Sequence, residues 1–200
     1  MKILLTGGHS GVGLALRQQL FQHDVVAPYR TQLDLCDYRN VIEFVDQRYD
    51  MLINCAGTGI GGKIDFVNHC PEDIQQIMQV NLLSPILLSQ SVLKRNSQAK
   101  IVNITSTNNV RYWPNDLAYS LSKKSLEQFG SMLAVEYPLL QYLEIRLGLT
   151  KTNFNQNRYK KEPNRYVDLY HNSHLTTDQV SSKICSVLFD NTVKFIEISP

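Results

Sequence analysis

Tyr119 and Lys123 lie four residues apart in the segment YSLSK, a spacing that can support proton transfer. Residues four apart in a helix share one face, so a lysine ammonium can stand beside a tyrosine hydroxyl. The ammonium would stabilise the tyrosinate and lower the tyrosine pKa, which is about 10 for a free side chain. The chain holds ten tyrosines, however, and the same pair can be part of a solvated helix surface. The pair alone does not distinguish these two interpretations.

The rest of the chain alternates short apolar runs with longer helical patterns. This alternation is typical of βαβ units that build a parallel sheet. We therefore predict one α/β domain over residues 1–200, a doubly wound, Rossmann-like parallel sheet with helices on both faces. Pro85 predicts a kink inside its helix. The predicted strands are 2–6, 24–29, 50–57, 99–106, 142–150 and 193–199. The predicted helices are 11–21, 38–48, 72–94, 116–136 and 177–188.

A glycine-rich turn, TGGHSGVG, follows the first predicted strand at residues 6–13. Gly7 permits a sharp turn out of the strand, Gly11 lets the backbone approach a pyrophosphate, and Gly13 lets the helix pack closely on the sheet. The helix N-terminus then offers N–H groups and a positive dipole end to phosphates. A purely structural turn is the alternative, because the spacing is not GxGxxG. The other residues of the predicted phosphate loop are His9, Ser10 and Val12.

Several motifs, in order along the chain, resemble the short-chain dehydrogenase/reductase family. They include the spacing TGxxxGxG, the segment NCAG at 54–57, and Asn81 in QVNLLSP. The strand IVNITS ends at Ser106, thirteen residues before Tyr119, and AYSLSKKSLEQFGSMLAVE at 118–136 is similar to the family's active-site helix. The resemblance covers nearly the whole chain. It places YSLSK in an active site.

The resemblance implies reversible hydride transfer between a nicotinamide and the carbonyl or alcohol carbon of a small molecule. Tyr119 would then exchange the proton, and Ser106 would hold the substrate oxygen. Lys123 would also bind the nicotinamide ribose, and Asn81 would anchor a water that connects Lys123 to solvent. The residues leave simpler roles open: Ser106 can cap the strand end, and Asn81 can be a helix-kink residue that bonds backbone. Thr105 is expected to point away from Ser106, since neighbouring strand residues face opposite sides.

The end of the second predicted strand bears on the choice of cofactor. Tyr29 stands where an acid that selects NAD is expected, and Arg30 follows it. Arg30 can pair with a 2′-phosphate, which favours NADP over NAD; alternatively, Arg30 stacks on the adenine or faces water. Few residues separate Arg30 from Asp34, where the family has a helix, so we expect an open adenine end. The resemblance assigns further cofactor contacts to Asp34, Leu35, Asn54, Ala56, Gly57 and Thr152, in addition to Tyr119 and Lys123.

The segment 152–175 is polar and takes the place of the family's mobile substrate lid. Its polarity argues against a steroid or a long acyl chain as substrate. A polar or anionic substrate, such as a sugar derivative, is one interpretation; a solvated loop is the other. The basic residues of this segment include Arg158, Lys160, Lys161 and Arg165.

The bulk composition excludes several other classes of protein. A net charge of +2 is too small to indicate binding to nucleic acid or to an anionic membrane. MKILLTGG is too short for a signal peptide, and no apolar run approaches a membrane span. The four cysteines show no metal-binding spacing, and His171 and His174 form only an isolated pair. We expect a cytoplasmic protein without a bound metal.

The family resemblance also implies a homodimer or homotetramer, associated through the helices predicted at 72–94 and 116–136. A non-catalytic cofactor-binding sensor or scaffold is the alternative function, because a fold does not determine an activity. Ser106 together with Tyr119 favours the enzyme, since a protein that only binds a cofactor does not need this pair.

Overall fold

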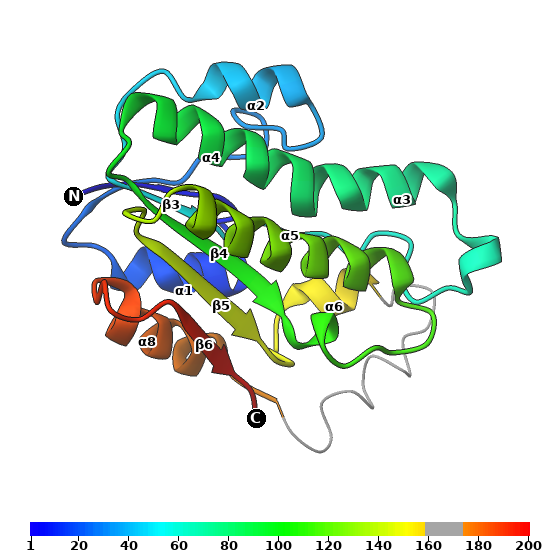
Figure 1. Cartoon of the computed structure of the whole chain (residues 1–200). Helices are drawn as coiled ribbons and strands as arrows, with labels where there is room; N and C mark the ends of the chain where they lie inside the picture. Colours follow the sequence, from blue (N-terminus) through cyan, green and yellow to red (C-terminus); the bar gives the residue numbers. More distant parts are fainter. Residues whose placement is uncertain (159–173) are drawn as a thin grey trace.

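The computed structural model describes residues 1–158 and 174–200, and six parallel strands form one sheet through its centre (Figure 1). The strand order is β2-β1-β3-β4-β5-β6, and every neighbouring pair is parallel. The order reverses at β1, so ligands are expected at the carboxyl ends of β1 and β3. The predicted fold class is confirmed. The strands are β1 (Lys2–Leu5), β2 (Asp24–Val26), β3 (Met51–Asn54), β4 (Lys100–Ser106), β5 (Tyr142–Leu147) and β6 (Phe195–Ile198).

Helices cover both faces of the sheet (Figure 1). In this view α1 and α8 lie below the sheet, and α2, α4 and α5 lie above it. No helix within residues 1–158 and 174–200 is long and apolar enough to cross a membrane. The α-helices are α1 (Gly11–Gln19), α2 (Tyr38–Phe44), α3 (Pro71–Met78), α4 (Ser84–Arg95), α5 (Leu117–Glu136), α6 (Asn153–Arg158) and α8 (Thr177–Leu188).

The first strand shows how the core is divided between the two faces. Ile3 and Leu5 pack with residues of α1 and α8, whereas Leu4 between them packs with residues of α2 and α4. All three are fully buried. Both faces of the parallel sheet are covered, so these three neighbouring residues are all apolar and do not alternate with polar ones.

The helix predicted over 72–94 is interrupted in the structure. A π-helical turn, Gln79–Leu83, separates α3 from α4, and Pro85 stands in the first turn of α4. Proline has no N–H to donate to the carbonyl of Asn81, four residues earlier, so a regular α-helix cannot continue through this point. The interruption thus lies before the proline and places Asn81 in the π-helical turn.

Several predicted boundaries are wrong. β2 ends at Val26 and β5 at Leu147, each three residues before its predicted end, because an apolar run does not itself mark where the chain leaves the sheet. The segment 152–175 begins with α6, although its sequence is polar and irregular. Residues 159–173 of this predicted substrate loop, including Lys160, Lys161 and Arg165, lie outside the described residues, as does His171.

Candidate active site

The glycine-rich turn joins β1 to α1 with a backbone that requires its glycines. Gly7 and Gly11 have φ angles of +73° and +49°, in the left-handed region. A Cβ on Gly13 would lie only 2.3 Å from the carbonyl oxygen of Gly7. The first turn of α1 carries no acidic residue, and the side chain of Ser10 makes no capping bond. The turn can therefore receive phosphate groups at the N–H groups of α1.

The end of β3 is tied to this turn. The Thr6 hydroxyl accepts hydrogen bonds from the backbone N–H groups of Cys55 and Ala56, both at 3.1 Å. Cys55, Ala56 and Gly57 line the main cavity, which has a volume of about 850 Å³. Asn54 does not line it.

Asn54 points into the protein instead. Its side-chain amide donates to the Asn103 side-chain oxygen at 2.9 Å, and the residue is 2% exposed. The cofactor contact of Asn54 therefore stays a prediction, and its side chain is held within the protein by Asn103. Its place along β3 turns the side chain toward β4 and α4, so it connects neighbouring strands.

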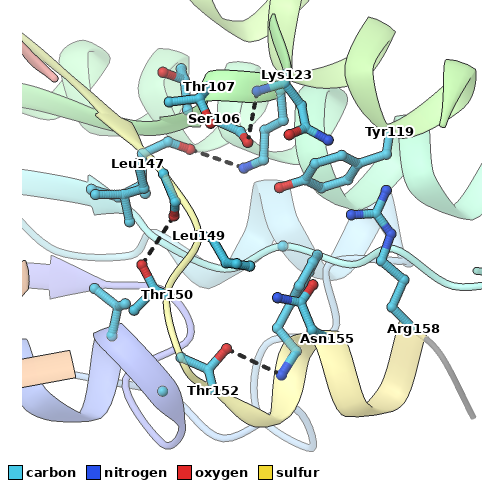
Figure 2. Close-up of a pocket in the computed structure, with 18 of the residues that line it drawn as sticks. Ser106, Thr107, Tyr119, Lys123, Leu147, Leu149, Thr150, Thr152, Asn155 and Arg158 are labelled. Atoms are coloured by element: carbon cyan, nitrogen blue, oxygen red, sulfur yellow. Dashed lines mark hydrogen bonds between the residues drawn. The ribbon is translucent and has the colours of Figure 1, made fainter. Parts of the chain in front are cut away.

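Three predicted catalytic side chains meet at the end of β4. Figure 2 shows the hydroxyl of Tyr119, from α5, directed toward Ser106 and the amine of Lys123. The Ser106 oxygen accepts a hydrogen bond of 3.2 Å from the Asn108 N–H, so Ser106 also caps the strand end. The Thr105 hydroxyl points away, toward Glu144. β4 and α5 together position the Ser–Tyr–Lys group at one end of the cavity.

Burial controls the ionisation of this group. Burial raises the pKa of Tyr119 to about 12, and its hydrogen bond with Ser106 acts in the opposite direction. Burial lowers the pKa of Lys123 to about 8. Lys123 does not contribute to the pKa shift of Tyr119 in this structure, so its expected effect on the tyrosine stays a prediction. The Lys123 amine instead donates to the carbonyl oxygen of Ile104, at 2.9 Å.

Asn81 connects the π-helical turn to the loop that follows β3. Its side-chain oxygen accepts from the Thr58 N–H at 2.8 Å, and its amide donates to the Thr58 carbonyl at 2.9 Å. The amide also reaches the Ser122 hydroxyl at 3.0 Å. A Cβ on Gly57 would lie 3.5 Å from both the Asn81 side-chain oxygen and the Lys123 amine, so the two side chains flank this glycine. Asn81 therefore has the backbone-bonding role that the sequence left open.

The predicted adenine end is open, and its residues lie outside the main cavity. The rings of His9 and Tyr29 stack with centroids 3.6 Å apart, and Arg17 approaches the His9 ring at 3.3 Å. Arg30 pairs with Asp34 at 3.6 Å, and both side chains are exposed. Leu35 also lies outside the cavity lining, and its carbonyl accepts a bond from Ser84.

Thr152, another predicted cofactor contact, directly precedes α6. Its hydroxyl accepts a hydrogen bond of 3.3 Å from the Phe154 N–H at the start of α6. Its methyl carbon would lie 3.2 Å from a Cβ on Gly11, so Thr152 packs directly over the glycine-rich turn. Thr152 lines the main cavity with Gly7, Ser10, Gly11, Val12 and Gly13.

The cavity also contains residues that were not predicted as site residues from the sequence. Arg158 of α6 reaches toward the Tyr119 ring (Figure 2). Its guanidinium carbon lies 4.5 Å from the centroid of that ring, and the guanidinium pairs with Asp116. Phe154 packs on Tyr119 with ring centroids 5.6 Å apart. The six residues of α6 show no apolar periodicity, so only the fold reveals that Arg158 reaches Tyr119. Lys63, Arg111 and Trp113 also line the cavity.

The described residues contain no group of three or more histidine, cysteine, aspartate or glutamate side chains that could hold a metal ion. The four cysteines are free thiols.

A family model for short chain dehydrogenases matches residues 29–163. The chain therefore belongs to this family of oxidoreductases. Among its relatives is the 3-ketodihydrosphingosine reductase of Bacteroides thetaiotaomicron, 28% identical over 205 residues that cover 90% of this chain and 76% of the relative. The chain spans about half the length of several other curated relatives.

Solved structures share the fold over almost the whole chain. A closed form of serine dehydrogenase complexed with NADP⁺ has a TM-score of 0.86 and 20% identity, covering 99% of this chain and 94% of its own. A 4-hydroxyisoleucine dehydrogenase complexed with NADH has a TM-score of 0.84 and 20% identity, with coverages of 99% and 96%. At this identity the likeness establishes the fold, and both neighbours hold a nicotinamide cofactor.

Proposed function

We propose that the chain is an NADP-dependent oxidoreductase that transfers hydride between the nicotinamide and a carbonyl or alcohol carbon of a small molecule. The observation that carries this proposal is the meeting of Ser106, Tyr119 and Lys123 in a cavity that extends to the glycine-rich turn. The residues present fit the cofactor, because the turn has left-handed glycines and an uncapped helix N-terminus that can receive a pyrophosphate.

Tyr119 serves as the proton donor when a carbonyl is reduced. The bound cofactor supplies the hydride to the carbonyl carbon, and negative charge develops on the oxygen. Because burial raises the pKa of Tyr119 to about 12, its hydroxyl is protonated at neutral pH and ready to donate.

Ser106 orients the substrate oxygen. Its oxygen accepts the Asn108 N–H, which leaves the hydroxyl proton to be donated. A hydrogen bond from Ser106 to the carbonyl oxygen strengthens as charge develops there, so it stabilises the transition state more than the ground state.

Lys123 and Asn81 support the proton transfer by Tyr119. The Lys123 amine is anchored on Ile104 and, with three donors when charged, can also bind the ribose hydroxyls. Asn81 holds the loop at Thr58 beside Lys123. Pro85 cannot donate to the Asn81 carbonyl, and this carbonyl is the acceptor that we propose for a water linked to Lys123.

The preference for NADP rests on the residues near the end of β2. Tyr29 stands in place of an acid, and Arg17 and Arg30 provide two guanidinium groups near the turn and this strand end. A guanidinium can bind a phosphate by two parallel hydrogen bonds. Asp34 pairs with Arg30, and an exposed pair of this kind is weak enough to be exchanged for a phosphate.

We also propose that the chain associates through α4 and α5. An open groove between these helices is lined largely by apolar side chains, and Met132 is 62% exposed. Burying such a surface against a second copy would remove it from water. Light scattering that showed only monomer at micromolar concentration would contradict this association.

The function is tested by a screen of aldehydes, ketones and sugar derivatives for consumption of NADPH, with Tyr119→Phe beside the wild type. Tyr137→Phe is the matched control, because Tyr137 is half exposed at the far end of α5. We expect activity that Tyr119→Phe removes and Tyr137→Phe keeps. If the protein binds NADPH but reduces none of these compounds, the result would favour the role of a sensor or scaffold.

A further inference from the structure

The charged side chains that line the cavity are all basic over the described residues. They belong to Lys63, Arg111, Lys123 and Arg158, and no carboxylate side chain joins them. Lys123 belongs to the proposed catalytic group, and the other three do not. A cleft lined by charges of one sign concentrates ligands of the opposite sign. The cavity is therefore suited to an anion.

Arg158 is the basic residue nearest to the proposed chemistry. It is 8% exposed, and its guanidinium carbon lies 4.5 Å from the centroid of the Tyr119 ring. Asp116, only three residues before Tyr119, pairs with this guanidinium. Asp116 is itself held by the Asn108 side chain, at 2.5 Å. The charge of Arg158 is thus fixed beside the proton donor by residues of the active site itself.

The aliphatic part of Arg158 is fixed as well. If Gly59 carried a Cβ, that atom would lie 3.1 Å from the Arg158 Cδ, so Gly59 packs closely against this part of the side chain. At the other end of the side chain, the guanidinium carbon lies 6.0 Å from the centroid of the Phe154 ring. Figure 2 shows the guanidinium reaching from α6 toward the Tyr119 ring. A site held in this way loses little conformational entropy when a ligand binds.

The guanidinium can serve two partners at once. It carries five N–H donors in a planar fork, so it can bind more than one acceptor. The planar fork matches a second carboxylate by two parallel hydrogen bonds. An anion bound there would lie close to the Tyr119 hydroxyl, and hence close to the carbon that receives the hydride.

We propose that Arg158 binds a substrate carboxylate, so that the substrate is an oxo acid or hydroxy acid whose carboxylate lies one or two carbons from the reacting carbon. This inference rests on the proposed function and narrows its substrate class. Lys63 and Arg111 draw the acid into the cavity, and Arg158 determines specificity. A phosphate on the substrate in place of the carboxylate is an outcome that the test separates.

The first experiment compares oxo acids with their methyl esters. NADPH-dependent reduction of 3-oxobutanoate and 4-methyl-2-oxopentanoate is measured beside the two esters, which keep the ketone and lose the charge. We expect kcat/KM at least about tenfold higher for one acid than for its ester, since hydrogen bonds to a charged group are strong. Arg158→Gln should remove this preference, mainly through KM of the acid, and Arg158→Lys should restore part of it. Arg39→Gln removes an exposed arginine of α2 and should leave the preference intact.

The second experiment measures binding without turnover. Calorimetry with succinate, its dimethyl ester and a short alkyl phosphate reports whether a carboxylate, a neutral molecule or a phosphate binds. We expect succinate to bind the wild type, and its affinity to fall at least about tenfold in Arg158→Gln. Binding of the phosphate in preference to succinate would overturn the carboxylate assignment.

The outcomes separate the inference from the proposed function. If Tyr119-dependent reduction occurs with equal kcat/KM for acids and esters, the inference is overturned and the function stands. If no carbonyl is reduced, the proposed function fails, and calorimetry still decides whether Arg158 forms a carboxylate site. If Arg158→Gln does not fold, the comparison of acid and ester in the wild type keeps the inference testable.

Discussion

The Lys123 amine donates a hydrogen bond of 2.9 Å to the carbonyl oxygen of Ile104, two residues before Ser106 on β4. This bond fixes the lysine of α5 to the strand that carries the serine. Lys123 is 4% exposed, and its burial lowers its pKa to about 8. The lysine therefore titrates in an accessible pH range.

The first prediction concerns the pH dependence of reduction. Tyr119 stays protonated through neutral pH, whereas Lys123 loses its charge as the pH rises through about 8. If the charged lysine binds the cofactor ribose, kcat/KM for reduction should be level at lower pH and fall above about 8. Arginine does not titrate in this range, so Lys123→Arg should lack this inflection at whatever activity it retains. An inflection at the same pH in both proteins would assign it to another group.

The second prediction concerns the effect of the Lys123 charge on the stability of the folded protein. Its pKa is lower in the folded than in the unfolded protein, so the unfolded state binds more protons between pH 8 and 10.5 and stability rises with pH in this window. Lys123→Met should raise the free energy of unfolding at pH 7 by about 1–3 kcal/mol, and by less at pH 10. Urea unfolding at the two pH values measures the change in the free energy of unfolding. An equal effect at both would contradict the lowered pKa.

The third prediction concerns the glycine-rich turn. Gly13→Ala places a methyl group 2.3 Å from the Gly7 carbonyl oxygen, which is backbone and cannot move aside. We expect a loss of at least about 2 kcal/mol in stability and of most NADPH affinity. Ser10→Ala is the matched control for folding, because the Ser10 side chain makes no capping bond. Urea unfolding and a fluorescence titration measure the two effects, and wild-type values for Gly13→Ala would contradict the packing.

The fourth prediction concerns the structural role of Asn81. Its side chain makes three hydrogen bonds and is fully buried. Asn81→Ala leaves both backbone groups of Thr58 without this partner, so the free energy of unfolding should fall by about 2–4 kcal/mol. Gln90→Ala on the exposed surface of α4 should change it by less than about 0.5 kcal/mol. Chemical denaturation that showed equal stability for both variants would exclude the anchoring role.

The fifth prediction tests the preference for NADP. Arg30→Ala should weaken NADPH binding about tenfold and NADH binding much less, because only NADPH has the 2′-phosphate. Asp34→Asn should strengthen NADPH binding, since it removes the carboxylate that pairs with Arg30. Fluorescence titration at low and moderate salt measures both. Tighter binding of NADH than NADPH by the wild type would contradict the preference.

The sequence predicted well the features that depend on local spacing. The glycine-rich turn lies between β1 and α1 as expected, because positive φ angles and close packing both require glycine there. Ser106 and Tyr119 face each other because β4 ends and α5 begins within the same thirteen-residue interval. Such features follow from short stretches of chain.

The sequence could not predict features that depend on which way a side chain turns. Asn54 belongs to NCAG, yet it bonds Asn103 on the next strand, a contact that requires the sheet register. The Arg158 pair with Asp116 joins residues more than forty positions apart and depends on the fold of α6. The raised pKa of Tyr119 likewise reflects burial, which the spacing of Tyr119 and Lys123 does not reveal.

The most direct test of the proposed function is the rate of NADPH consumption by Tyr119→Phe relative to the wild type, with the best carbonyl substrate from the screen. General acid catalysis contributes about a hundredfold to ten-thousandfold, so the substitution should reduce kcat by at least about a hundredfold. Tyr137→Phe should stay within about threefold of the wild type, and a fluorescence titration should show that Tyr119→Phe still binds NADPH. A Tyr119→Phe protein that reduced the substrate at the wild-type rate would show that Tyr119 is not the proton donor.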